Sequence, residues 1–277
     1  LFGVPPLEGA VKNIFFGALT WISYHGLGHL IQENGYIKKS FTGKHTESCV
    51  DDCNASEEIE LTEREAIISH VTELAADVEA MQLSASSIFI QAFHKHLTKI
   101  SDSGPDEASI AEIQKDSKAR HEFQENLCSM TAGLAITLYR FNEGKPYQPT
   151  ASAIKSHPTP LRRLEHCLTN LFEGLDAGGQ GMLLHGLNRE QLVMRCTGSA
   201  FGVFICNKIK GGTLNIDPDS APIVRGILED PYLRSYWRDI INAWDEVKGE
   251  VSNVRRFGVE SGQMDFSPEL RAKIFAG

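Results

Sequence analysis

Apolar side chains along this chain recur mostly at the spacing of an α-helix. In the first such stretch, Val11–Tyr24, four large apolar residues fall near helical spacing, and we expect them to bury the helix. These residues are Ile14, Phe15, Leu19 and Ile22. The pattern therefore predicts a buried helix that leads directly into the residues after Tyr24.

The helix predicted over residues 61–83 has the clearest signal in the chain. It is dense in helix-forming residues, and Thr62 is followed three positions later by Glu65, which is the pattern of a capping box. Helical periodicity also predicts which side faces the core. The expected apolar face consists of Ala66, Ile67, His70, Val71 and Leu74.

The rest of the pattern adds more helices and a little strand. Trp237 and Trp244 are expected core residues of one of these helices, and Pro158 is expected to open another at an allowed first-turn position. Two short runs rich in β-branched and aromatic residues indicate strands. The predicted helices lie in 85–100, in 107–141 as one short and one long helix, after 158 and in 221–251, and the predicted strands are 200–206 and 212–216. The fold class is therefore predicted to be mainly α with a minor β component.

Composition narrows the classes of partner. The chain has 277 residues, of which 42% are hydrophobic, so it can bury a full core. Its net charge of -9 argues against nucleic acid as a partner, because phosphate binding needs a basic surface. No apolar run is long enough to span a membrane. The six cysteines lack C-x-x-C spacing, so we expect mostly reduced thiols and a cytoplasmic location.

Candidate chemistry begins immediately after the first apolar stretch, at His25-Gly26-Leu-Gly28-His29. Residues four apart lie on one face of a helix, so both imidazoles can point at one metal ion. Such a pair also arises by chance in helices. However, two glycines are unfavourable in a helix interior unless the backbone packs closely there, and a buried histidine needs a partner. We therefore predict His25 and His29 to be metal ligands.

A second part of the candidate site is Glu73 with Asp77, four residues later in the predicted helix 61–83. Glu73 is predicted to be a third, carboxylate ligand, and a fourth position left to water gives the open tetrahedral geometry of a catalytic zinc. Asp77 can then orient a ligating histidine or pair with an arginine. The alternative for two acidic residues at this spacing is a solvated helix face.

Three segments share their order, spacing and flanking residues with a known family. They are Ala18-Leu-Thr-Trp21-Ile-Ser-Tyr-His25, Glu73-Leu-Ala-Ala76-Asp77 and His157-Pro158-Thr-Pro-Leu-Arg-Arg163. Together they resemble the Lit-type phage-exclusion zinc metallopeptidases, with their HExxH, ExxAD and HPxxxxR elements. The last two segments also look like those of the CAAX prenyl proteases and heat-shock membrane peptidases. The resemblance covers residues 10–175.

The resemblance implies a zincin-like metallopeptidase core in residues 1–175 and a protein substrate or partner. Residues 176–277 would be a helical C-terminal extension with short strands. Zincins normally place an edge strand before the two-histidine helix, and residues 1–10 contain none. We therefore expect the N-terminal part of the parent protein to be missing; the alternative is that the substrate is held differently from the family pattern. The implied site has Zn²⁺ held by His25, His29 and Glu73, Asp77 as their supporting partner, His157 near the reacting carbonyl and Arg163 as a structural or electrostatic clamp.

The chain departs from the family pattern at Gly26. In HExxH this position holds the glutamate that takes a proton from the zinc-bound water. General acid and base assistance typically contributes ~10²–10⁴-fold, so a chain without this glutamate is predicted to be inactive or nearly so. Gly26 is either the natural residue or a substitution introduced to trap an inactive enzyme. A substitute general base from Glu33, Glu65 or Glu79 has no positional support.

The predicted function is therefore a Lit-like zinc metallopeptidase for an intracellular protein that lacks its general base. Two alternatives remain at this point. One is a zinc-binding pseudopeptidase that recognises a protein partner, and the other is a helical interaction module without a metal. In the second alternative the two histidines and the glutamate would not converge.

Overall fold

The computed structural model describes residues 7–31, 62–103, 107–141, 157–177, 189–210, 231–251, 255–256, 259–260, 264 and 266–276. These residues are almost entirely helical, so the predicted mainly α fold class is confirmed. The helices are α1 (Leu7–Ile31), α3 (Glu63–Ser103), α4 (Glu107–Lys115), α5 (Ser117–Phe141), α6 (Pro160–Ala177), α8 (Arg189–Lys210), α10 (Pro231–Val251) and α11 (Pro268–Phe275). Among the described residues, β1 (Arg255–Arg256) and β2 (Val259–Glu260) form a two-residue antiparallel pair.

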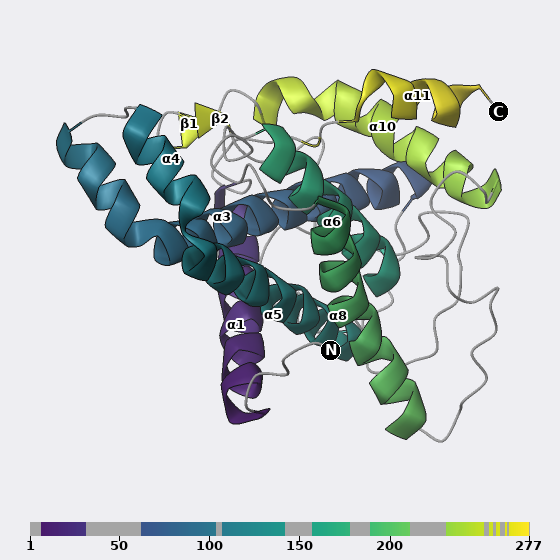
Figure 1. Ribbon diagram of the computed structural model, residues 1–277. Coiled ribbons are helices and arrows are strands. Elements are labelled where there is room, and N and C mark those ends of the chain that lie inside the picture. Colours follow the sequence, from purple (N-terminus) through teal and green to yellow (C-terminus); the bar gives the residue numbers. More distant parts are fainter. Residues whose placement is uncertain are drawn as a thin grey trace.

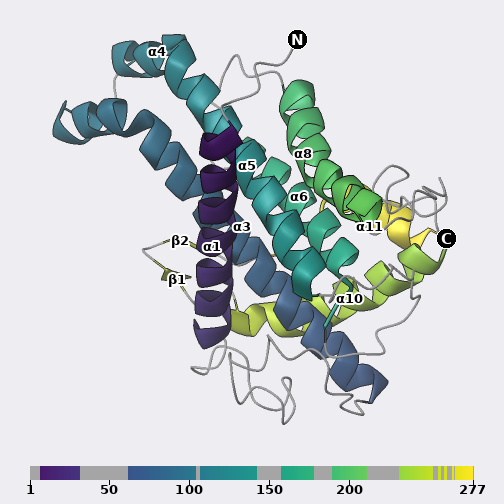
Figure 2. The ribbon, with the colours of Figure 1, turned by 90° about the horizontal axis from the view of Figure 1, so that it is seen from below.

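The helices are arranged around α5 and α3. Figure 2 shows α1, α5 and α8 running alongside one another, and α5 packs against both of its neighbours. Helix α3 crosses this group and contacts α1, α5 and α6 (Figure 1). Helix α10 packs across α3, and α11 packs against α10. None of the described helices combines the length and the apolar character needed to cross a bilayer.

Two clusters of buried apolar side chains hold these helices together. The first joins α1, α3, α4, α5, α6 and α8 around residues such as Trp21, Phe93, Phe123, Leu134, Leu164 and Cys196. The second joins α3, α10 and α11 around residues such as Val71, Leu74, Trp237, Trp244 and Ile274. The prediction that Trp237 and Trp244 belong to the core is confirmed. Each cluster contains residues from both sides of position 175, which is the predicted boundary between the metallopeptidase core and the C-terminal extension.

The start of α3 has the predicted capping box. The backbone N–H of Thr62 donates to Glu65 Oε2 at 2.9 Å, and the backbone N–H of Glu65 donates to Thr62 Oγ1 at 3.3 Å. These two bonds satisfy donors that the helix itself leaves unpaired. The predicted inner face is also confirmed, since all five of its residues are buried or partly buried. Helix α3 then continues without a break to Ser103.

The predicted inner face of α1 is wrong for three of its four residues, and only Ile14 is partly buried. Phe15 is 61% exposed, and Leu19 and Ile22 are also exposed, whereas Trp21 is fully buried. The side chains of Val11, Phe15, Leu19 and Ile22 form an apolar stripe along the outside of α1, and no other described helix covers this stripe. Phe15, Leu19 and Ile22 give α1 a strongly apolar side, but that side does not face the core.

Helix α1 packs instead through small residues. A β-carbon added at Gly17 would lie 2.8 Å from the Cα of Met130 in α5. A β-carbon added at Gly133 in α5 would lie 2.5 Å from the carbonyl oxygen of Ile14. Because real β-carbons do not come this close to a backbone, only glycine permits this approach of the two helices. The core-facing side of α1 therefore combines glycines, which permit close contact between helices, with the fully buried Trp21.

Two other predictions need correction. The segment Ala200–Cys206 is part of α8 and is not a strand. Leu192, Cys196 and Ala200 are buried at four-residue intervals, so the helical period along one core face overrides the β propensity of the sequence. The other predicted strand, 212–216, lies outside the described residues. Helix α6 begins at Pro160 rather than at Pro158.

Candidate metal centre

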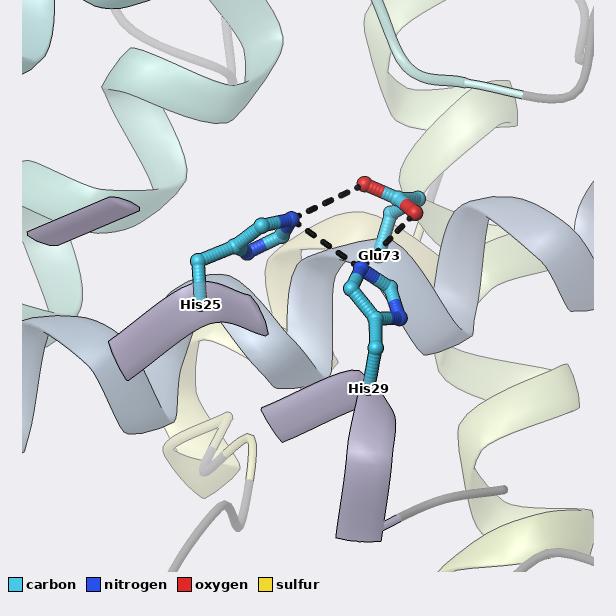
Figure 3. Close-up of side chains that lie close together, drawn as sticks. All are labelled: His25, His29 and Glu73. Atoms are coloured by element: carbon cyan, nitrogen blue, oxygen red, sulfur yellow. Dashed lines mark hydrogen bonds and ion pairs between the residues drawn. The ribbon is translucent and has the colours of Figure 1, made fainter. Parts of the chain in front are cut away.

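Helix α1 presents two imidazoles side by side at its C-terminal end. The Nε2 atoms of His25 and His29 are 3.0 Å apart, and the rings meet edge to face (Figure 3). His25 is buried and His29 is partly buried. Their spacing of four residues places them on one face, as expected from the helical repeat.

Glu73 reaches the two imidazoles from α3. Its Oε1 lies 3.0 Å from His29 Nε2, and its Oε2 lies 3.5 Å from His25 Nε2. Figure 3 shows the three side chains pointing toward one another from the two helices. Gly28 allows the helices to approach here, because a β-carbon on it would lie 3.1 Å from the Cβ of Ala76 in α3.

These three side chains form the one cluster of potential metal ligands found among the described residues. Zinc bonds of ~2.1 Å at tetrahedral angles put neighbouring ligand atoms about 3.4 Å apart. The Nε2 atoms of the two histidines are 3.0 Å apart, and Glu73 approaches them through different oxygens, with Oε1 3.0 Å from His29 Nε2 and Oε2 3.5 Å from His25 Nε2. The two imidazoles and the carboxylate are therefore close enough to share one small metal ion.

Asp77 and Arg163 lie next to the three candidate ligands and contact them. Asp77 lies one turn after Glu73, and its Oδ1 is 3.1 Å from His25 Nδ1, although the ring N–H is not aligned for a linear hydrogen bond. Arg163 Nη2 contacts Asp77 Oδ1 at 2.8 Å and Glu73 Oε2 at 3.3 Å. It also lies 3.1 Å from His25 Nε2. One guanidinium thus contacts both carboxylates and one imidazole.

Burial and charge set the ionisation of this group. Burial alone would raise the pKa of Glu73, but His29, Arg163 and His157 outweigh it and hold that pKa well below its usual value. Burial acts in the same direction on Asp77, where the charge of Arg163, together with the nearby His25 imidazole, lowers the pKa. Both carboxylates are therefore ionised beside one guanidinium. With neutral imidazoles the buried cluster has a net negative charge, which a divalent cation offsets.

Trp21 is a site residue whose role the sequence analysis missed. Its ring is stacked on the His25 imidazole, with centroids 5.0 Å apart and planes at 13°. The guanidinium carbon of Arg163 lies 5.7 Å from the centre of the same ring. Trp21 was noted only as part of the family motif, but its position one turn before His25 was the signal for this contact.

His157 and Gly26 complete the predicted set. His157 Nε2 lies 3.5 Å from Glu73 Oε1, and the side chain is 26% exposed, so it stands at the edge of the cluster before α6 begins. Gly26 lies between the two histidines in sequence, and a β-carbon there would meet nothing within 4 Å. All seven predicted site residues thus lie in or beside one cluster, and Glu65, once considered as a substitute base, instead caps α3.

Comparison with known proteins gives no family for the chain. No family model matches it, and neither the curated proteins nor the solved structures contain a significant match.

Proposed function

We propose that this chain holds Zn²⁺ in a zincin-like site and is a Lit-like metallopeptidase whose general base is absent. The convergence of His25, His29 and Glu73 supports this proposal most directly. Two imidazoles and a carboxylate from two helices are a typical ligand set of catalytic zinc. The resemblance of the motifs to the phage-exclusion peptidases adds the expectation of an intracellular protein substrate.

The surrounding residues suit hydrolysis of a carbonyl compound. When bound, zinc polarises a carbonyl and lowers the pKa of water to about 7. Asp77 would hold the proton of His25 on Nδ1 and so keep a lone pair on Nε2, which Arg163 Nη2 faces at 3.1 Å and which a metal ion would take in its place. Arg163 fixes both carboxylates, and His157, partly exposed at the edge of the cluster, can donate an N–H to the oxygen on which negative charge develops.

Gly26 is the reason for proposing little or no activity. No side chain at this position can move a proton between the metal-bound water and the leaving group. The space around its α-carbon would accept a β-carbon, so the environment suits a larger residue. Because general acid and base assistance typically contributes ~10²–10⁴-fold, hydrolysis by this form would be slow.

The apolar stripe on α1 favours a second candidate function. Val11, Phe15, Leu19 and Ile22 are exposed together, and exposed apolar patches commonly mark sites of protein interaction. In this alternative the chain is a pseudopeptidase, or a helical interaction module, that recognises a protein partner without cutting it. A zinc ion would then be structural or absent.

Metal content separates the metal-free module from the other two candidates. Protein purified without a histidine tag should contain about one zinc per chain by elemental analysis. His29→Ala should lose it, because a ligand is removed, while His94→Ala should keep it, because that exposed histidine on α3 is outside the cluster. Equal zinc contents in the two variants, or no zinc after zinc addition, would overturn the assignment of the ligands.

Restoring a carboxylate at position 26 tests the peptidase. Gly26→Glu should raise cleavage of a cellular protein by a factor of ~10² or more with unchanged zinc content. Gly26→Gln is the matched control, since it has the same size and no proton carrier. New protein termini in cells that express each form, with and without phage infection, provide the measurement. If Gly26→Glu binds zinc and leaves every cellular protein intact, the zinc-bearing binding module is the better description.

A further inference from the structure

A pair of cysteines lies at the contact between α5 and α8, away from the candidate metal centre. The sulfur atoms of Cys128 and Cys196 are 3.9 Å apart, although the residues are 68 positions apart in sequence. Both are free thiols in the structure. A disulfide requires about 2.05 Å between the sulfurs, so small rotations within these side chains and a slight shift of the helices would close the bond.

The backbone at this contact is already held in register. The hydroxyl of Thr131 donates to the carbonyl oxygen of Cys128 at 2.9 Å and to that of Cys196 at 3.1 Å. One side chain thus joins the two helices at the level of the two sulfurs. The cysteines are therefore kept opposite one another by contacts that do not involve the thiols.

The two thiols differ in their access to solvent. Cys196 is fully buried, whereas Cys128 is 8% exposed. Arg195 lies beside the pair and bonds Glu125 and Gln124, one turn before Cys128. A hydrogen bond from Cys196, and then the charge of Arg195, lower the pKa of Cys128, while burial opposes them. Cys128 is thus the more reactive thiol, because the thiolate is the form that attacks an oxidant.

Cys167 supplies an internal contrast. It is fully buried in the core, and both burial and the negative charge of Asp77 raise its pKa well above the usual value. It is a free thiol in the structure. A buried thiol of this kind is expected to be inert.

We propose that Cys128 and Cys196 are an oxidative modification site, at which hydrogen peroxide forms a reversible disulfide that fastens α8 to α5. The Cys128 thiolate attacks one peroxide oxygen, the O–O bond breaks, and the hydroxide that leaves takes up the proton released by the Cys128 thiol and departs as water. The Cys196 sulfur then attacks the Cys128 sulfenic acid. The S–O bond breaks, and the thiol proton leaves with the oxygen as a second water. Two thiols lose two electrons in total, and one peroxide is reduced to two waters.

This inference is independent of the proposed metal site and of hydrolysis. Its structural consequence concerns α5, because this helix contacts α1, the helix of the two imidazoles, on one side and α8 on the other. A covalent bond between α5 and α8 closes a long loop of the unfolded chain. The oxidised protein should therefore melt roughly 4–12 °C higher than the reduced protein.

The test uses the full chain, treated with a small excess of hydrogen peroxide under native conditions. Mass spectrometry of alkylated digests should show a bond between Cys128 and Cys196 that dithiothreitol reverses, while Cys167 stays reduced. The digest must cleave between Cys196 and Cys206, for instance after Phe201 or Phe204, so that the two cysteines fall in different peptides. Cys196→Ser should accumulate a sulfenic acid on Cys128 that dimedone traps, and Cys128→Ser should give neither product.

Circular dichroism should show that each variant is folded before oxidation. A bond that forms only after unfolding, a bond from Cys128 to another cysteine, or equal oxidation of Cys167 would overturn the inference. So would a folded protein in which Cys128 reacts with neither peroxide nor dimedone. The rise in melting temperature should occur in the wild type and in Cys167→Ala, and not in Cys196→Ser.

Discussion

Arg163 and Asp77 form a two-point ion pair inside the protein. Nε of Arg163 donates to Asp77 Oδ2 at 2.9 Å, and its Nη2 donates to Oδ1 at 2.8 Å. Both side chains are buried. Because Arg163 belongs to α6 and Asp77 follows Glu73 by one turn of α3, the pair fixes α6 against the turn that presents the Glu73 carboxylate.

Removing the charge of Asp77 should therefore affect both folding and metal binding. Asp77→Asn leaves the Arg163 guanidinium buried beside a neutral amide, and the free energy of unfolding should fall by about 3 kcal/mol or more. Zinc affinity should fall ~10–100-fold, because the support of His25 is lost. Asp245→Asn is the control, since its pair with Arg271 is partly exposed and should contribute about 1 kcal/mol or less. Equal losses of stability in denaturant titrations would contradict the importance of burial.

Zinc should stabilise the folded chain. A ligand present at ~100 times its dissociation constant adds about 2.7 kcal/mol to the free energy of unfolding, which corresponds to a rise in melting temperature of roughly 5–10 °C for a chain of this size. Chelation by EDTA should reverse the rise. In His29→Ala the same zinc addition should leave the melting temperature unchanged. Differential scanning fluorimetry measures both, and an equal rise in the variant would place the zinc elsewhere.

Acid should destabilise the protein through His166. Burial lowers the pKa of this residue to about 4, while Asp77 and a backbone hydrogen bond at Leu74 act in the opposite direction. The unfolded chain takes up this proton near pH 6.5, and the folded protein does so only near pH 4. The unfolded state therefore binds more protons in this window, and stability falls as the pH falls, by a total of about 3 kcal/mol.

His166→Phe tests this dependence. The substitution removes the titrating group but keeps an aromatic ring next to Trp237, on which the imidazole is stacked at 5.4 Å. The free energy of unfolding, measured by urea titration between pH 7 and pH 4, should fall less steeply in the variant. His121→Gln, at an exposed position, should have the profile of the wild type. Parallel profiles for all three proteins would rule out His166 as the source.

Replacing two phenylalanines in turn should show that the outside of α1 contributes less to stability than the core does. Phe15 is 61% exposed, and Phe93 in α3 is fully buried. Phe93→Ala should cost about 3–5 kcal/mol of stability, while Phe15→Ala should cost about 0.5 kcal/mol or less. Chemical denaturation of both variants measures the difference. A large loss at Phe15 would mean that its ring is covered in solution.

The candidate site could be predicted from the sequence because its parts are local. The spacing of His25 and His29, the spacing of Glu73 and Asp77, and the capping box of Thr62 and Glu65 each depend on a single helix and its 3.6-residue repeat. The meeting of the two helices at one point was an expectation from family resemblance. Spacing within one helix cannot indicate which other helix it contacts.

Features that depend on packing between helices were predicted less well. The inner side of α1 was assigned to its largest apolar residues, but Gly17 permits a close approach to α5 that no large residue allows. The run Ala200–Cys206 has strand-like residues, and the burial of Cys196 and Ala200 in the core keeps it helical. In both cases the deciding partner lies far away in sequence.

The open space at Gly26 has a consequence for how readily the chain can change. A β-carbon at this position would meet no neighbour within 4 Å, and replacing the glycine would remove about 1 kcal/mol of helix cost. The glycine codons GGA and GGG become the glutamate codons GAA and GAG through a single base change. Where the gene uses one of these codons, the carboxylate can be gained or lost in one mutational step at a position whose backbone already has room for a side chain.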